Sequence, residues 1–162
     1  MKLHALLATA LAAFSLTAGA ETTITLTDLH NCCQGCERGI VNALESVDGV
    51  KVAMDKTSAT LTAKNQGDAD KAMAKLLDAG YYGKGMPVLS VPDKKVQSAT
   101  VSGTHLCCGK CVKGVDAAIK DTAGATKHSA VKGAKTFTVE GNFNLKDLLA
   151  ALHKHGYHGK IE

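Results

Sequence analysis

Two seven-residue windows contain every cysteine of this chain. His-Asn-Cys-Cys-Gln-Gly-Cys occupies residues 30–36, the first cysteine window, and His-Leu-Cys-Cys-Gly-Lys-Cys occupies residues 105–111, the second cysteine window. A framework of structural disulfides would distribute its cysteines so that they link distant loops. Here they form two equal groups of soft sulfur donors at matched positions. The pattern predicts a protein built from two copies of one metal-binding unit.

The residues around the first cysteine window predict six elements in the order strand, helix, strand, strand, helix, strand. Apolar residues alternate with polar ones before the window and recur at spacings of three and four after it, which indicates a strand followed by a helix. Gly49 and Gly80 are placed to end the two helices. The predicted elements are a strand over 22–29, a helix from Cys36 that ends at Gly49, strands over 50–54 and 59–63, a helix capped by Asp68 that ends at Gly80, and a short strand from Tyr81.

The second cysteine window lies in a segment with the same predicted order. Gly-Tyr-His-Gly-Lys at 156–160 repeats Gly-Tyr-Tyr-Gly-Lys at 80–84. Both prolines of the chain lie between the two copies, which indicates a linker. The prediction is α+β, two ferredoxin-like βαββαβ domains in tandem. Residues 21–84 form the first domain, 85–95 the linker and 96–162 the second domain.

Residues 1–20 have the pattern of a secretory signal peptide. Lys2 precedes an apolar run, and the segment ends in the small residues Ala18-Gly19-Ala20. The expected mature protein is therefore periplasmic or secreted. No later segment has the roughly 20 apolar residues of a membrane-spanning helix, so no membrane insertion is expected after cleavage.

The charge of the chain argues against a nucleic-acid partner. Loss of the signal peptide with Lys2 leaves a net charge of +3, which is too mild for binding to a polyanion. No nucleophile with a base, acid–base pair or phosphate-binding loop is visible either. The expectation is a protein that is not an enzyme.

Each cysteine window combines features that suit a soft metal ion. A Cys-x-x-Cys pair at the start of a helix brings two sulfurs within reach of one ion, and the free N–H groups of the helix N-terminus stabilise thiolate. Thiolates select Cu(I), Zn(II) and similar soft ions over magnesium or calcium. A third sulfur and an imidazole would allow three or four ligands. The candidate ligands are Cys33, Cys36, Cys108 and Cys111, then Cys32 and Cys107, then His30 and His105.

These motifs resemble the heavy-metal-associated domain. That family shares the βαββαβ order, a Cys-x-x-Cys after the first strand and Gly-Tyr after the second helix, and it includes copper chaperones and the periplasmic mercury-binding protein. The resemblance implies that Cys33 and Cys36, with Cys108 and Cys111, bind the metal. The usual Gly-Met-Thr before the first cysteine is replaced by residues 30–32 and 105–107. Cysteine in the threonine position resembles variants that handle divalent soft metals.

The predicted function is extracytoplasmic binding, sequestration or transfer of a soft heavy-metal ion, namely Cu(I), Zn(II), Cd(II) or Hg(II). The expected partner is a metal transporter or a metal-receiving protein, so the chain would be a metallochaperone. The alternative is a thiol–disulfide redox protein that uses the same cysteines, because cysteines outside the cytoplasm tend to oxidise.

Overall fold

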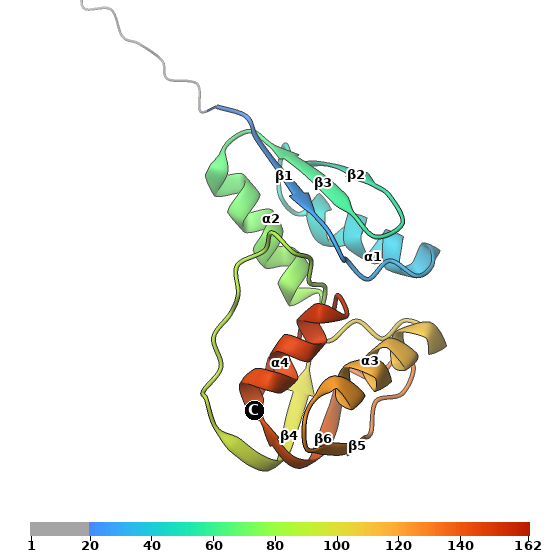
Figure 1. Ribbon diagram of the computed structural model, residues 1–162. Helices are drawn as coiled ribbons and strands as arrows, with labels where there is room; N and C mark the ends of the chain where they lie inside the picture. The colour runs from blue at the N-terminus through green and yellow to red at the C-terminus, as the bar shows by residue number, and fades with distance from the viewer. Residues whose placement is uncertain (1–19) are drawn as a thin grey trace, which may run out of the picture.

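The computed structural model describes residues 20–162, so the predicted signal peptide lies outside the described residues except for Ala20. Within this range the chain forms four helices and two antiparallel sheets, each sheet carrying two helices (Figure 1). We refer to residues 20–84 as the N-terminal half and to residues 95–162 as the C-terminal half. No helix between residues 20 and 162 is long and apolar enough to cross a membrane.

The N-terminal half contains the first five predicted elements. Its sheet has the strand order β1-β3-β2, with antiparallel pairing throughout. Apolar residues that alternate along β3 face the helices and are buried, whereas the residues between them are partly exposed. The elements are β1 (Thr22–Leu26), α1 (Gln34–Glu45), β2 (Lys51–Met54), β3 (Ala59–Ala63) and α2 (Gln66–Asp78).

Two details of the N-terminal half differ from the prediction. The expected strand from Tyr81 is absent, and Tyr81 forms a single β-bridge with Tyr157 of the other half instead. The cap of α2 is Asn65 rather than Asp68, because the Asn65 side chain accepts a hydrogen bond from the Asp68 N–H at 3.0 Å. The helix ends as predicted near Gly80, whose positive φ of 86° suits glycine.

The C-terminal half repeats the order and completes it with a last strand. Its sheet has the strand order β5-β6-β4-β7, and Val101 and Ser102 of β4 pair with the final strand. The second strand of its hairpin is nine residues long. The elements are β4 (Lys95–Ser102), α3 (Gly109–Asp121), β5 (Ala125–His128), β6 (Thr136–Asn144), α4 (Leu145–Lys154) and β7 (Lys160–Ile161).

Aliphatic side chains fill the space between each sheet and its helices. Ile40 and Leu76 are fully buried in the N-terminal half, and Val115 and Leu148 are fully buried in the C-terminal half. Burial of one such side chain contributes about 1.5–3 kcal/mol. These helices and sheets therefore form a firm support for the loops that begin α1 and α3.

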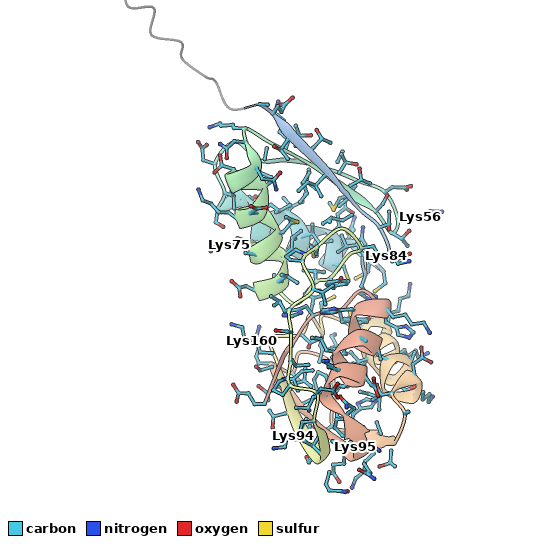
Figure 2. The ribbon with its side chains drawn as sticks, turned by 60° about the vertical axis from the view of Figure 1, so that its left-hand side comes forward. Lys56, Lys75, Lys84, Lys94, Lys95 and Lys160 are labelled. Atoms are coloured by element: carbon cyan, nitrogen blue, oxygen red, sulfur yellow. The ribbon has the colours of Figure 1, made fainter. Side chains whose placement is uncertain are left out.

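The two halves meet through the segments that follow α2 and α4. The Tyr82 N–H donates to the Gly156 carbonyl at 3.1 Å, and the His158 N–H donates to the Gly80 carbonyl at 3.0 Å. In Figure 1 the green α2 and the red α4 approach each other at this junction. Figure 2 labels Lys160 at the same level, and its Nζ lies 3.7 Å from the Asp78 carboxylate of the other half.

Candidate metal site

Each cysteine window bends so that its Cys-x-x-Cys pair begins a helix. Cys33 and Cys108 are the N-cap residues of α1 and α3, with extended backbones at φ values of −166° and −150°. The Cys36 N–H donates to the Cys33 carbonyl at 2.9 Å, and the Cys111 N–H donates to the Cys108 carbonyl at 3.1 Å. These bonds form the first helical turn and direct both sulfurs of a pair toward the same point.

Within each window the sulfurs lie close together. The Sγ–Sγ distance is 3.8 Å between Cys33 and Cys36 and 3.6 Å between Cys108 and Cys111. The third cysteine joins its pair, since Cys32 Sγ lies 3.7 Å from Cys36 Sγ. All six cysteines of the chain are free thiols. The N-terminal loop thus brings together three donors that could bind a soft ion.

The two windows also face each other, so the six sulfurs form one group, which we call the six-cysteine cluster. Cys36 Sγ lies 3.7 Å from Cys107 Sγ, and Cys32 Sγ lies 3.7 Å from Cys108 Sγ. The helices that begin at these loops, α1 and α3, start on the same side of the molecule in Figure 1. Their N-termini place the partial positive charge of two helices beside the sulfurs.

A tyrosine from each half contacts the window of the other half. Tyr157 Oη lies 2.9 Å from His30 Nε2, and Tyr81 Oη lies 3.0 Å from the ring nitrogens of His105. Each tyrosine also donates its hydroxyl proton to a cysteine carbonyl of its own half, Tyr81 to Cys36 and Tyr157 to Cys111, both at 3.0 Å. The two contacts are related by an approximate two-fold arrangement of the halves.

The hydrogen bonds of Tyr157 indicate which nitrogen of His30 is available to a metal. Because the Tyr157 hydroxyl donates to Cys111, it must accept from His30, so the proton is on Nε2 of that ring. In the neutral form of the ring, the other nitrogen of His30 is then the one with a lone pair for a metal. A histidine ligand is commonly oriented in this way by a partner on its other nitrogen.

Both predicted histidines lie within reach of the sulfurs. His30 forms a group with Cys32, Cys36 and Cys111 in which the potential ligand atoms all lie within 4.8 Å of one another. His105 forms a similar group with Cys36, Cys107 and Cys111. All eight predicted ligands therefore belong to one region, and their ligation of a metal stays a prediction.

Two helix-interior glycines allow these contacts, and we did not identify them from the sequence. A Cβ atom at Gly39 of α1 would collide with the Tyr81 hydroxyl, and a Cβ atom at Gly114 of α3 would collide with the Tyr157 hydroxyl. Glycine inside a helix costs about 1 kcal/mol relative to alanine. Its recurrence at matched positions on both helices was the signal available in the sequence.

The cluster contains thiols with different pKa values. Hydrogen bonding to Cys111, with further help from the Cys32 backbone, lowers the pKa of Cys36 to about 6. The N–H groups of Cys36 and Cys111 lower the pKa of Cys33 and Cys108 respectively. Burial raises the pKa of Cys32 far above its usual range, and burial does the same for Cys107 in the opposite half. At neutral pH part of the cluster is therefore already thiolate.

The histidines near the end of α4 lie elsewhere. His153 Nε2 is 3.0 Å from His158 Nδ1, and both rings are buried. His153 also stacks on Tyr82 across the junction, with ring centroids 3.7 Å apart and an interplanar angle of 1°. His155 contacts the Asp121 carboxylate at 2.9 Å. These side chains stabilise the junction and the end of α4.

Comparisons with known proteins include a similarity to a solved structure. The chain is similar to the solution structure of the N-terminal soluble domains of Bacillus subtilis CopA, with 18% sequence identity, a TM-score of 0.34, and coverage of 89% of this chain and 95% of that chain. No protein-family model matches the sequence, and no curated protein matches it.

Proposed function

We propose that this chain binds a soft heavy-metal ion, Cu(I), Zn(II), Cd(II) or Hg(II), through the cysteines of its two windows. The observation that carries the proposal is the six-cysteine cluster, in which free thiols from two loops approach to 3.6–4.0 Å. Such a set of donors suits soft ions and excludes magnesium and calcium, which require oxygen ligands.

The two halves are, in this proposal, tandem ferredoxin-like domains of the heavy-metal-associated type. Support comes from the identical order of their first five elements and from Cys-x-x-Cys at the start of both α1 and α3. The domains would extend over 21–84 and 96–162, with residues 85–95 as the linker. In such an arrangement each fold would present one loop of cysteines to the ion.

The chemistry proposed is thiolate binding followed by ligand exchange. Cys36, with its pKa of about 6, would supply a thiolate at neutral pH without further loss of a proton. Cys33 and Cys108 are partly exposed, and a surface hollow lined by Cys32, Cys33 and Glu37 leads to the cluster. An incoming thiolate of another protein could therefore reach an ion at this edge and replace one ligand at a time.

The proposed setting is the periplasm or the exterior of the cell, with a metal transporter or a metal-receiving protein as partner. The signal-type pattern of residues 1–20 supports this setting. An oxidising compartment would make the reduced state of the cysteines depend on bound metal, because ligation protects thiolates from oxidation.

Metal content tests the proposed function. The mature protein, purified without oxygen, would be measured by mass spectrometry together with a count of free thiols. We expect soft ions that are lost when the thiols are alkylated, and Ser46→Ala, an exposed change at the end of α1, serves as the control that retains them. A reduced protein that refuses Cu(I), Zn(II) and Hg(II) and reoxidises to discrete disulfides would instead be a redox protein.

A further inference from the structure

The sulfur atoms of the two windows are as close between halves as within them. Cys33 Sγ lies 3.8 Å from Cys36 Sγ of its own loop and 3.8 Å from Cys107 Sγ of the other loop. Cys36 Sγ likewise lies 3.9 Å from Cys111 Sγ. A protein with two independent sites would separate its loops by more than one ion's coordination shell. The distances therefore point to a single site, an inference that rests on the metal binding proposed above.

The six sulfurs have the arrangement of an octahedron. Nine pairs lie at 3.6–4.0 Å, and Cys32 lies within 4.8 Å of both Cys33 and Cys111. These eleven pairs are eleven of the twelve edges of one octahedron. Its three pairs of opposite corners each join one cysteine of each half, namely Cys32 with Cys107, Cys33 with Cys111, and Cys36 with Cys108.

The edge lengths select the coordination number. A metal–thiolate bond of about 2.3 Å requires sulfurs about 4.6 Å apart for linear binding, about 4.0 Å apart for a trigonal ion and about 3.8 Å apart for a tetrahedral ion. The face formed by Cys33, Cys36 and Cys107 has edges of 3.8, 3.7 and 3.8 Å. The pairs are thus too close for linear binding. An octahedron has no four mutually adjacent corners, so a tetrahedral ion would need a histidine as its fourth ligand, as in the group of His30 with Cys32, Cys36 and Cys111. Its faces fit trigonal ions.

Trigonal ions on alternate faces would be bridged by shared sulfurs. An octahedron has four alternate faces, and each corner belongs to two of them. Three of the four faces then combine sulfurs of both halves. Where the six sulfurs alone are the ligands, low coordination numbers and bridging thiolates suit a soft monovalent ion, which favours Cu(I) over Zn(II). Four such ions and six thiolates leave a charge of −2, which the N-termini of α1 and α3 partly offset.

We propose that the six thiolates form one site, shared by both halves, that binds a thiolate-bridged cluster of up to four Cu(I) ions. Binding transfers no electrons: Cu(I) enters as the monovalent ion, and each thiol that becomes a ligand releases its proton to solvent. The cluster joins the halves through metal–sulfur bonds.

Native mass spectrometry of the reduced full chain, titrated anaerobically with Cu(I) in competition with a Cu(I) chelator, tests the proposal. We expect a four-copper species that forms with little accumulation of lower species. Cys33→Ser with Cys36→Ser, and separately Cys108→Ser with Cys111→Ser, should each reduce the stoichiometry from four ions to at most one. Each double variant lacks at least one sulfur in three of the four alternate faces. Only one face then keeps its three cysteine ligands.

The two proposals fail in different ways. A parent protein that binds two ions, with each double variant binding one, would overturn the shared site and leave the proposed function intact. A parent that binds no soft ion would overturn the proposed function itself. Because a double variant can fail to fold, X-ray absorption of the copper-loaded parent gives a second test: three sulfur neighbours with a copper–copper contact support the cluster, and copper with two sulfurs and no copper neighbour contradicts it.

Discussion

The pair of buried histidines at the junction predicts a loss of stability in mild acid. His153 stacks on Tyr82 and hydrogen-bonds His158, and burial together with the nearby His158 lowers its pKa from 6.5 to about 4. The folded protein therefore keeps this ring neutral at pH values where the unfolded chain already binds a proton. Stability from this group is fully present above pH 6.5, is lost as the pH falls toward 4, and is constant below that.

The expected magnitude follows from the shift. Between pH 7.5 and pH 4.5 a histidine whose pKa falls from 6.5 to about 4 on folding reduces the free energy of unfolding by about 2.5 kcal/mol. Carboxylates also titrate in this range, so the histidine contribution must be separated from theirs. His153→Phe retains a ring against Tyr82 and removes the titrating group, which makes it the informative variant.

Urea unfolding of the reduced, metal-free protein, followed by circular dichroism at both pH values, measures the effect. The parent should lose about 2.5 kcal/mol more than His153→Phe over this interval. Ser46→Ala, an exposed change at the end of α1 that removes no titrating group, should lose as much as the parent. Equal losses in the parent and in His153→Phe would refute the reasoning, because they would show that the buried ring titrates alike in the folded and unfolded states.

The remaining predictions concern the cysteine region. Tyr157→Phe removes a hydroxyl that bonds both halves and should lower the free energy of unfolding by about 1–3 kcal/mol in a urea titration. Gly114→Ala should destabilise the protein despite the better helix propensity of alanine, whereas Gly109→Ala, where a Cβ atom meets open space, should not; equal thermal midpoints for the two would contradict the steric argument. Metal binding at pH 7 should release protons from Cys32 and Cys107, whose pKa values are raised, and calorimetry in buffers of different ionisation enthalpy would detect the release or its absence.

The element order could be predicted because it depends on local patterns. Periodicities of two and of three to four residues indicated the first five elements of each half, and Gly80 marked the end of α2 correctly. The cap of α2 was wrong because Asn65 and Asp68 are both good capping residues three positions apart, and only the backbone direction decides between them.

The close approach of the two cysteine windows to each other could not be predicted in the same way. It depends on contacts such as Tyr81 with His105 and Tyr157 with His30, which join residues 24 and 127 positions apart. Each window alone looks like a complete site with three sulfurs and an imidazole. The sequence therefore predicted two metal-binding units without deciding whether they share one ion, and the approach of Cys36 to Cys107 became visible only with both halves in place.

A site shared by two halves would favour retention of the metal over rapid transfer. A ligand that binds only when the two cysteine windows face each other stabilises that arrangement. The stabilisation grows with the logarithm of the ratio of ligand concentration to dissociation constant. Without metal the halves are joined mainly by neutral contacts, such as the Tyr82 and His158 hydrogen bonds to the opposite backbone. A receiving protein would have to compete with both cysteine windows at once unless this junction opens. Hydrogen exchange at the Tyr82 and His158 amides should therefore slow on copper loading, and unchanged exchange would mean that the metal does not join the halves.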